Sequence, residues 1–405
     1  MEHSLLIVGA GPAGLMAALS AARAHPGPVA VFDQMPKAGA KLAAAGGGRG
    51  NLSHAASEDD FAAAFGRHGR FAIPAFRSLP PDLLRDELAR VGVPTVVDTD
   101  GRIYPRNQNA GSVRDALFLA CQRAGVRFLF NRRALSIRSP ASPDGPWLVD
   151  DLSARCVVLA AGGQSAPRFG SDGSGFALAS ALGYSIVSPV PALVSLRSEE
   201  SWPASLSGVS LPAATLSLKS PKRPPAVAGG GLLFTHRGIS GPAVLNLSGA
   251  VARRLRDSSP VVVHLSFVPD VPRFDQLRRA QGARSVLGWL AERLPRSLAA
   301  ALLDLASIPA STPFAVLSSA QERSLSRLLS ACPLSVRSTG GFDESMATSG
   351  GVSLKQVDPL TLQGKLSPRL FFAGEILDID GPTGGWNLHW AFASGRLAGL
   401  SAARA

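Results

Sequence analysis

The first 33 residues carry the pattern that most constrains the fold: strand, glycine turn, helix, strand, acid. Residues 5–8 are an apolar run, and residues 29–32 are a second one that ends at Asp33. The turn between them consists of Gly9, Ala10, Gly11, Pro12, Ala13 and Gly14. In a dinucleotide-binding βαβ unit, such glycines permit the tight turn, the approach of a pyrophosphate and close packing of helix on sheet. A glycine turn in another α/β protein is the alternative, but strand, helix and acid together favour a nucleotide site.

Composition sets the class of protein. A chain of 405 residues with 46% hydrophobic residues is long enough for two or three folded units with sizeable cores. We find no run of eighteen apolar residues, so no membrane span is expected. Glu2 has the wrong charge for a signal peptide, and we expect a cytoplasmic protein.

Charge and cysteines narrow the partners. The net charge is +12, but the arginines are spread along the chain without a basic run, so a nucleic-acid partner is not expected. Cys121, Cys156 and Cys332 show no CxxC spacing, which argues against a metal site or a redox disulfide. We expect a small-molecule substrate, and the sequence leaves the oligomeric state open.

A second glycine-rich segment follows the βαβ unit. Its predicted cofactor contacts are Lys41, Leu42, Gly48, Arg49 and Asn51. Successive glycines suit a loop laid along a phosphate or a planar ring, with backbone N–H groups as donors and Arg49 neutralising charge. A glycine-rich surface loop is the alternative.

Further cofactor contacts are predicted beside these segments. The apolar strand at residues 156–160 ends at Ala161 and Gly162, where backbone can again pass near a nucleotide. We add Gln34, which follows Asp33, and Ala134 to the predicted cofactor-binding residues.

The last 36 residues show the same order of strand, glycine turn and helix as the first βαβ unit. A strand at residues 370–373 stops at Gly374 and Glu375, and a glycine loop then leads into a helix. Many FAD proteins complete their site in this way: the acid takes a ribityl hydroxyl, and the positive helix end faces the flavin N1/C2 edge. FAD is therefore a better prediction than NAD. The helix start supplies the predicted contacts Gly385, Trp386, Asn387 and Leu388.

The middle of the chain has a different residue pattern. Alternating strands and frequent prolines over residues 190–270 predict an antiparallel β-barrel-like substrate domain, and residues 271–340 predict a helical subdomain. Residues 1–189 and 341–405 then form one Rossmann-like α/β FAD-binding domain that this insertion interrupts.

Five stretches together resemble the YhiN/BaiN-like family of FAD-binding oxidoreductases, which includes aminoacetone-oxidase-like proteins. They are residues 9–14, 41–51, 101–105, 231–242 and 372–387. The resemblance implies a Rossmann-like FAD domain, an inserted β-barrel and a helical subdomain. The family commonly has Cys where this chain has Gly50, and Tyr and Gln where it has Trp386 and His389. No cysteine chemistry is therefore expected at the glycine loop, and the wall facing the flavin differs.

Two histidines are candidates for moving protons during flavin chemistry. His236 lies at a turn before a predicted helix, and His389 lies in the first turn of the flavin-facing helix, where the dipole disfavours its charged form. Packing within the helix is the alternative for His389, and a hydrogen bond within its own loop is the alternative for His236.

The sequence thus predicts an FAD-dependent oxidoreductase acting on an unidentified small molecule. No second GxGxxG unit exists in the sequence, so NAD(P)H would visit the flavin transiently, or oxygen would serve as the redox partner. An RNA-modifying flavoprotein and a non-catalytic flavin-binding protein are the alternatives.

Overall fold

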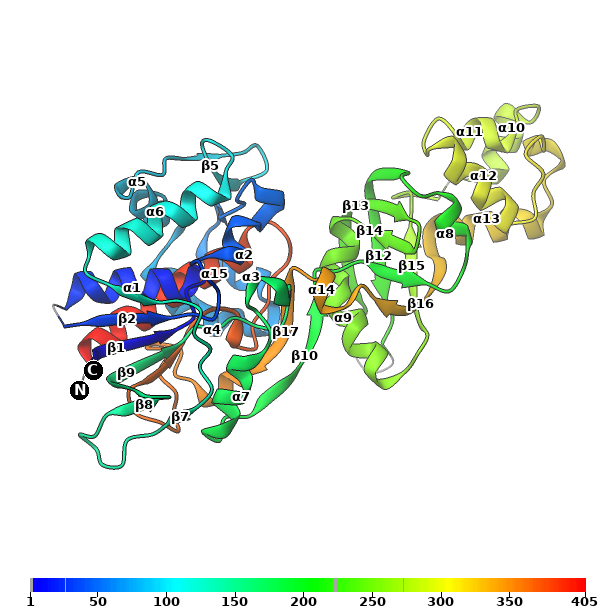
Figure 1. Ribbon diagram of the computed structural model, residues 1–405. Coiled ribbons are helices and arrows are strands. Elements are labelled where there is room, and N and C mark those ends of the chain that lie inside the picture. Colours follow the sequence, from blue (N-terminus) through cyan, green and yellow to red (C-terminus); the bar gives the residue numbers. More distant parts are fainter. Residues whose placement is uncertain (1–2, 26, 221–223, 272) are drawn as a thin grey trace. The chain divides into compact units, whose positions relative to one another are not determined.

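The computed structural model describes residues 3–25, 27–220, 224–271 and 273–405. Its contacts divide the chain into two compact units (Figure 1). Unit 1 comprises Met1–Val190 and Met346–Ala405, and unit 2 comprises Pro191–Ser345. The chain therefore returns to the first unit at Met346.

Unit 1 is built on a seven-stranded sheet in the order β6-β2-β1-β9-β8-β7, with β18 paired to β9. The strands β6, β2, β1, β9 and β18 are parallel, whereas β8 and β7 add an antiparallel edge. Their bounds are β1 His3–Val8, β2 Val29–Phe32, β6 Arg127–Leu129, β7 Ile137–Arg138, β8 Trp147–Val149, β9 Leu152–Leu159 and β18 Leu370–Phe372. Within these strands, residues 5–8, 29–32, 156–159 and 370–372 are continuous apolar runs and are buried, as expected for strands that are covered on both faces.

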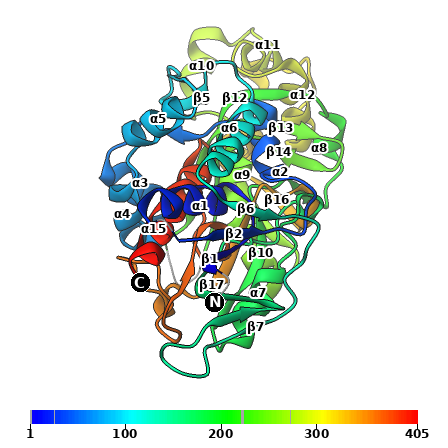
Figure 2. The same cartoon turned by 60° about the vertical axis from the view of Figure 1, so that its left-hand side comes forward.

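Helices α1 and α15 lie side by side against this sheet, and both contact β1 and β9 (Figures 1 and 2). The helices of unit 1 are α1 Pro12–Ala24, α2 Ala40–Ala43, α3 Glu58–Ala64, α4 Gly69–Ser78, α5 Pro81–Arg90, α6 Ala110–Arg123, α7 Ser174–Ala181 and α15 Trp386–Arg404. A small sheet, β3-β5-β4, consists of Ser53–His54, Arg102–Pro105 and Thr95–Val97. A further two-stranded sheet pairs β10 Ile186–Ala192 with β17 Ala347–Val352.

Two glycines allow α15 to approach α1 closely. A Cβ atom on Gly395 would lie 2.2 Å from the Ala13 carbonyl oxygen, and one on Gly399 would lie 2.3 Å from the Ala17 carbonyl oxygen. Any larger residue at either position therefore collides with the backbone of α1. The contact therefore holds α15 against α1, the helix that begins within the predicted cofactor turn.

We expect a Gly399→Ala variant to be destabilised by about 1–3 kcal/mol, the usual cost of overpacking a tight contact. The direction of the stability change is informative, because replacing Gly by Ala in an exposed helix would stabilise that helix by about 1 kcal/mol. Chemical denaturation measures the difference. Ser401→Ala, on the half-buried surface of the same helix, is the control and should change stability little. A Gly399→Ala protein more stable than the wild type would contradict the close packing.

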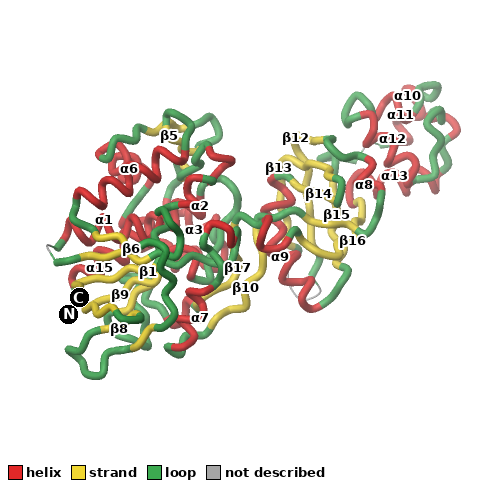
Figure 3. The backbone as a smooth tube through the Cα atoms, in the orientation of Figure 1, coloured by secondary structure: helices red, strands yellow, loops and turns green. Residues whose placement is uncertain are grey.

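Unit 2 contains a closed six-stranded barrel in the order β11-β14-β13-β12-β15-β16 (Figure 3). Its strands are β11 Leu196–Ser198, β12 Ser210–Leu218, β13 Ala226–Thr235, β14 Gly238–Ser240, β15 Val261–Ser266 and β16 Cys332–Thr339. Its helices are α8 Trp202–Ser205, α9 Pro242–Asp257, α10 Phe274–Gln281, α11 Val286–Leu290, α12 Arg296–Leu305, α13 Ser319–Ala331 and α14 Gly341–Glu344.

The barrel corrects one expectation. Residues 332–339 were expected to be the end of the helical subdomain, but they form β16, which pairs with β15 and β11 and closes the barrel. The strand begins at the residue that follows α13, so no turn separates the helical pattern from the alternating one. Leu334 and Val336 point into the barrel core with no exposed surface, which is the period-2 burial of a strand.

Candidate cofactor site

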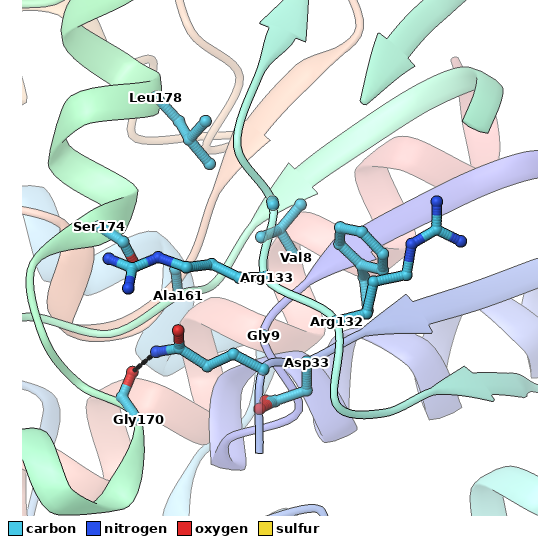
Figure 4. A pocket seen from close by; sticks show the side chains of 12 residues that line it. Val8, Gly9, Asp33, Arg132, Arg133, Ala161, Gly170, Ser174 and Leu178 are labelled. Carbon is cyan, nitrogen blue, oxygen red and sulfur yellow. Dashed lines mark hydrogen bonds between the residues drawn. The ribbon is translucent and has the colours of Figure 1, made fainter. Parts of the chain in front are cut away.

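Some of the predicted cofactor residues line a pocket at the carboxyl ends of the parallel strands (Figure 4). It encloses about 370 Å³ of empty space open to solvent. It is lined by Val8, Gly9, Phe32, Asp33, Gln34, Arg132, Arg133, Ala134, Ala161, Gly170, Ser174 and Leu178. Five of these, Gly9, Asp33, Gln34, Ala134 and Ala161, were predicted from the sequence. The crevice at these strand ends is where α/β sheets bind nucleotides.

The three glycines of the turn meet different surroundings. Gly9 has φ = 109°, and a Cβ there would lie 2.3 Å from the Ala160 carbonyl oxygen. A Cβ on Gly14 would lie 1.8 Å from the Gly9 carbonyl oxygen, so this glycine serves helix packing. A Cβ on Gly11 would meet nothing within 4 Å. The open space at Gly11, at the N-terminus of α1, suits an anionic pyrophosphate.

Asp33 holds the turn and faces the same pocket. Its carboxylate oxygens accept hydrogen bonds from the backbone N–H groups of Ala10 (2.6 Å) and Met35 (2.7 Å). Burial raises the pKa of Asp33 above its usual value, and these two hydrogen bonds oppose that rise. Each oxygen keeps a lone pair that can accept a ribose hydroxyl.

Three neighbours complete the rim of the pocket. The Gln34 side-chain nitrogen donates to the Gly170 carbonyl oxygen at 2.8 Å (Figure 4). The guanidinium of Arg132 lies over the Phe32 ring, 5.1 Å from its centroid, and Arg133 pairs with Asp172 at 3.1 Å. The two arginines were not predicted as site residues. Their position directly before Ala134 was the available signal.

Lys41 and Glu375 form an ion pair although 334 positions separate them in the sequence. The Lys41 Nζ lies 2.6 Å from one Glu375 carboxylate oxygen and 2.5 Å from the Ser165 hydroxyl. The other oxygen accepts from the Ser165 hydroxyl at 2.7 Å and from the Thr348 backbone N–H at 2.6 Å. The structure therefore fixes the orientation of the acid that was predicted to bind the ribityl chain.

A Glu375→Gln variant is expected to bind FAD at least about tenfold more weakly, because a charge-assisted hydrogen bond contributes about 1.5–3 kcal/mol. A fluorescence titration of the apoprotein with FAD measures the affinity. Glu344→Gln removes an ion pair to Arg197 in unit 2 and serves as the matched control. Equal FAD affinity in the wild type and Glu375→Gln would contradict a cofactor role for this acid.

The glycine-rich segment joins α2 to β3. Gly46, Gly47 and Gly48 all have positive φ, and Cβ atoms on Gly47 and Gly48 would meet nothing within 4 Å. Arg49 donates to the Gln108 side-chain oxygen at 2.8 Å, and its guanidinium lies 4.8 Å from the centroid of the Tyr104 ring. Leu42 is buried in the core, where it anchors the segment. The open backbone at Gly47 and Gly48 leaves room for a ligand.

The N-terminus of α15 lies against β3. Gly385 has φ = 94°, and a Cβ there would lie 2.5 Å from the Ser53 carbonyl oxygen. The Asn51 amide links the two segments, because its nitrogen reaches the Ser53 carbonyl oxygen at 3.2 Å and its oxygen reaches the Gly385 N–H at 3.3 Å. Gly385 is the N-cap and offers no side-chain cap to the first turn of the helix. The free N–H groups of that turn can therefore serve a ligand.

The loop and first turn beside Gly385 are held by side chains. The Asn387 amide bonds the Gly381 backbone N–H and carbonyl, both at 2.8 Å, and so fixes the glycine loop. Trp386 stacks on His54 with ring centroids 4.7 Å apart. Leu388 is half-buried and packs against the core.

The two predicted catalytic histidines lie in different units. His389 is 1% exposed, and its Nε2 lies 2.8 Å from the Leu79 carbonyl oxygen. Because that carbonyl can only accept, Nε2 carries the proton and Nδ1 accepts from the Ser53 hydroxyl at 2.5 Å. Burial lowers the pKa of His389 to about 4. These contacts favour the packing alternative for His389. His236 is exposed at the turn between β13 and β14 in unit 2.

One titratable cluster was missed by the sequence analysis. His68 Nε2 and Arg67 Nη2 each lie 3.9 Å from a carboxylate oxygen of Asp378, whose side chain is 9% exposed. Burial lowers the pKa of His68, and the Asp378 charge opposes that change. Asp380 accepts instead from the Ser349 hydroxyl at 2.7 Å, so the two aspartates face different partners. Nothing in the sequence around His68 marks it as a site residue.

A metal site, a membrane span and reactive cysteines have little support in the described part of the chain. Among those residues, no group of three His, Cys, Asp or Glu side chains could hold a metal ion. No helix in the same ranges is both long and apolar enough to cross a membrane. All three cysteines are buried, and burial raises the pKa of Cys121 and of Cys332 to about 12. These two thiols are therefore protonated and unreactive at neutral pH.

Comparison with known proteins covers nearly the whole chain. The family described as HI0933-like protein Rossmann domain matches residues 3–401. The chain is 32% identical to the 3-dehydro-bile acid delta(4,6)-reductase of Clostridium scindens over 98% of both chains. It is 27% identical to the ribosomal RNA dihydrouridine synthase of Escherichia coli, covering 96% of this chain and 95% of that protein.

Solved structures show the same fold at low sequence identity. The 3-ketosteroid delta1-dehydrogenase of Sterolibacterium denitrificans superposes with a TM-score of 0.53 at 13% identity and covers 99% of both chains. The 3-ketosteroid-delta4-(5alpha)-dehydrogenase of Rhodococcus jostii RHA1 superposes with a TM-score of 0.51 at 16% identity, covering 99% of this chain and 96% of that one. The family match over residues 3–401 and the 32% identical relative establish that the chain belongs to the HI0933-like family and is an FAD-dependent oxidoreductase.

Proposed function

We propose that this enzyme reduces a carbon–carbon double bond conjugated to a carbonyl group in a small apolar molecule, with NAD(P)H as the electron donor. The observation that carries the proposal is the match over 98% of both chains to a reductase named for a 3-dehydro-bile acid. Bound FAD would supply the hydride for this reaction. The residues of this chain bind the cofactor, orient it and manage protons around it.

The cofactor-binding roles follow from the geometry of unit 1. The N-terminus of α1 at Gly11 would hold the pyrophosphate, and Asp33 would accept the ribose hydroxyls. Glu375, oriented by Lys41, would accept a ribityl hydroxyl. The free N–H groups of α15 at Gly385 would face the electron-rich edge of the flavin and raise its reduction potential.

Two histidines are candidates for proton handling in this proposal, and a third has a positioning role. His236, which is exposed, stays a candidate donor to substrate. His68 is added because a buried carboxylate lies 3.9 Å from its ring. His389 is assigned to positioning, because both ring nitrogens already have partners inside the protein.

Turnover with a 3-oxo-Δ4 steroid and with a short-chain enone tests the proposal. We expect NADH or NADPH oxidation that depends on the enone, and a product heavier by two hydrogen atoms in the mass spectrum. The saturated ketone of the same skeleton is the control and should not be reduced. A flavin that NAD(P)H reduces but that no conjugated enone reoxidises would contradict this substrate class.

A second candidate is reduction of uridine in ribosomal RNA. The 27% identical Escherichia coli relative and the net charge of +12 favour it. Incubation of the reduced enzyme with unmodified ribosomal RNA, followed by nucleoside mass spectrometry, separates the two candidates. Dihydrouridine without enone turnover would select the RNA reaction.

A further inference from the structure

A cluster of three arginines surrounds one buried carboxylate on the helical side of unit 1. Arg23 of α1 donates to one oxygen of Glu87 at 2.8 Å, and Arg90 of α5 donates to the other at 2.8 Å. Arg396 of α15 approaches that second oxygen at 3.4 Å. The Glu87 side chain is 9% exposed. A single carboxylate therefore faces three permanent positive charges.

The charges are not equally compensated. Arg23 lies in the last turn of α1 and Arg90 in the last turn of α5, where the helix dipole offsets part of a positive charge. Arg396 lies in the middle of α15, where the dipole offers no compensation. Its one contact with Glu87 is long, and its buried Nε has no hydrogen-bond partner among the described residues. The charge of Arg396 is thus the least satisfied of the three.

A pocket opens directly beside this cluster. It encloses about 510 Å³ of empty space open to solvent. Its polar lining is Ser20, Arg23, Glu87 and Arg396, and the remainder is apolar side chains of α1 and α15. The space admits a tetrahedral oxyanion, and two of the arginines reach it with planar forks of N–H donors that match such an anion.

We propose that this pocket binds a phosphate-sized oxyanion, held chiefly by Arg396 and Arg23. The site is distinct from the predicted pyrophosphate site, because Gly11 and Arg23 lie at opposite ends of α1. At 1.5 Å per residue the two positions are about 18 Å apart along the helix. Three arginines and one glutamate leave two positive charges uncompensated, and a doubly charged anion neutralises them. Glu87 also limits the affinity, because it repels the anion and occupies N–H donors of the arginines.

The test uses the FAD-saturated protein, so that the phosphate-binding end of α1 is already filled. Inorganic phosphate is titrated by isothermal calorimetry at constant ionic strength, and acetate provides the arm for a singly charged anion. We expect saturable phosphate binding and weaker acetate binding. Arg396→Gln should weaken phosphate binding at least about tenfold, which corresponds to about 1.4 kcal/mol. Glu87→Gln should strengthen it.

Arg77→Gln is the matched control, because Arg77 forms a two-point ion pair with Glu58 within the same unit. It should leave phosphate affinity within about twofold of the wild type, a change below about 0.5 kcal/mol. Thermal melting and FAD content verify the fold of each variant, and Arg23→Gln replaces Arg396→Gln if the latter does not fold. Absence of saturable binding, or binding that loss of these arginines leaves unchanged, would overturn the proposal and leave a purely structural ion-pair network.

Discussion

A Gly11→Ala variant is expected to fold like the wild type and to lose most of its affinity for FAD. The backbone at Gly11 has φ = −72° and ψ = −176°, which any residue adopts, and the added methyl group meets no atom within 4 Å. With FAD bound, the same methyl group would stand where the pyrophosphate approaches the helix N-terminus. We expect FAD binding to weaken at least about tenfold, or about 1.4 kcal/mol.

Thermal melting of the apoprotein and a fluorescence titration with FAD measure the two effects separately. Gly14→Ala is the complementary variant, because its methyl group would lie 1.8 Å from the Gly9 carbonyl oxygen. That protein should lose stability before any cofactor is added. A Gly11→Ala protein with normal FAD affinity would show that the pyrophosphate does not cross this glycine.

His389 is expected to make stability strongly dependent on pH. Burial lowers its pKa to about 4 in the folded protein from an ordinary value of 6.5. Below pH 6.5 the unfolded chain therefore binds a proton that the folded one refuses, so stability is full above that pH and falls as the pH drops toward 4. At 1.36 kcal/mol per pKa unit, the loss from this one residue is about 3 kcal/mol.

Denaturant unfolding at pH 7.5 and at pH 4.5 measures this loss. His389→Gln should be less stable at pH 7.5 but should lack most of the His389 contribution to the decrease at low pH. His25→Gln, at an exposed position, is the control and should retain the full decrease. Identical pH dependence in wild type and His389→Gln would contradict the burial of a neutral histidine.

The nucleotide turn was predictable because its determinants are local. Gly14 and Asp33 act through neighbours in or directly beside one βαβ unit, so the spacing of these residues predicts their geometry. Gly9 also packs against the backbone of Ala160, which the sequence does not place beside it. Lys41 and Glu375 were each predicted as cofactor residues. Their ion pair was not, because only the folded sheet brings together residues from opposite ends of the chain.

The misses share the same physical cause. The location of His389 in the first turn of a helix was correctly expected, but its burial depends on Ser53 and Leu79, which the sequence does not place beside it. His68 is a candidate only because it lies near the Asp378 carboxylate, which is far from it in the sequence. The strand β16 directly continues a helical pattern, and only its pairing with β15 and β11, which lie far away in the sequence, makes it a strand. Contacts of long sequence separation decided each of these cases.

An absorbance spectrum of the purified protein, followed by anaerobic addition of NADH or NADPH, shows whether the protein holds FAD and takes electrons from a nicotinamide nucleotide. We expect the two flavin bands, released FAD on denaturation, and bleaching by one of the two nucleotides. A protein that shows no flavin, and that takes up none when FAD is added to the apoprotein, would contradict the assignment of FAD as the cofactor.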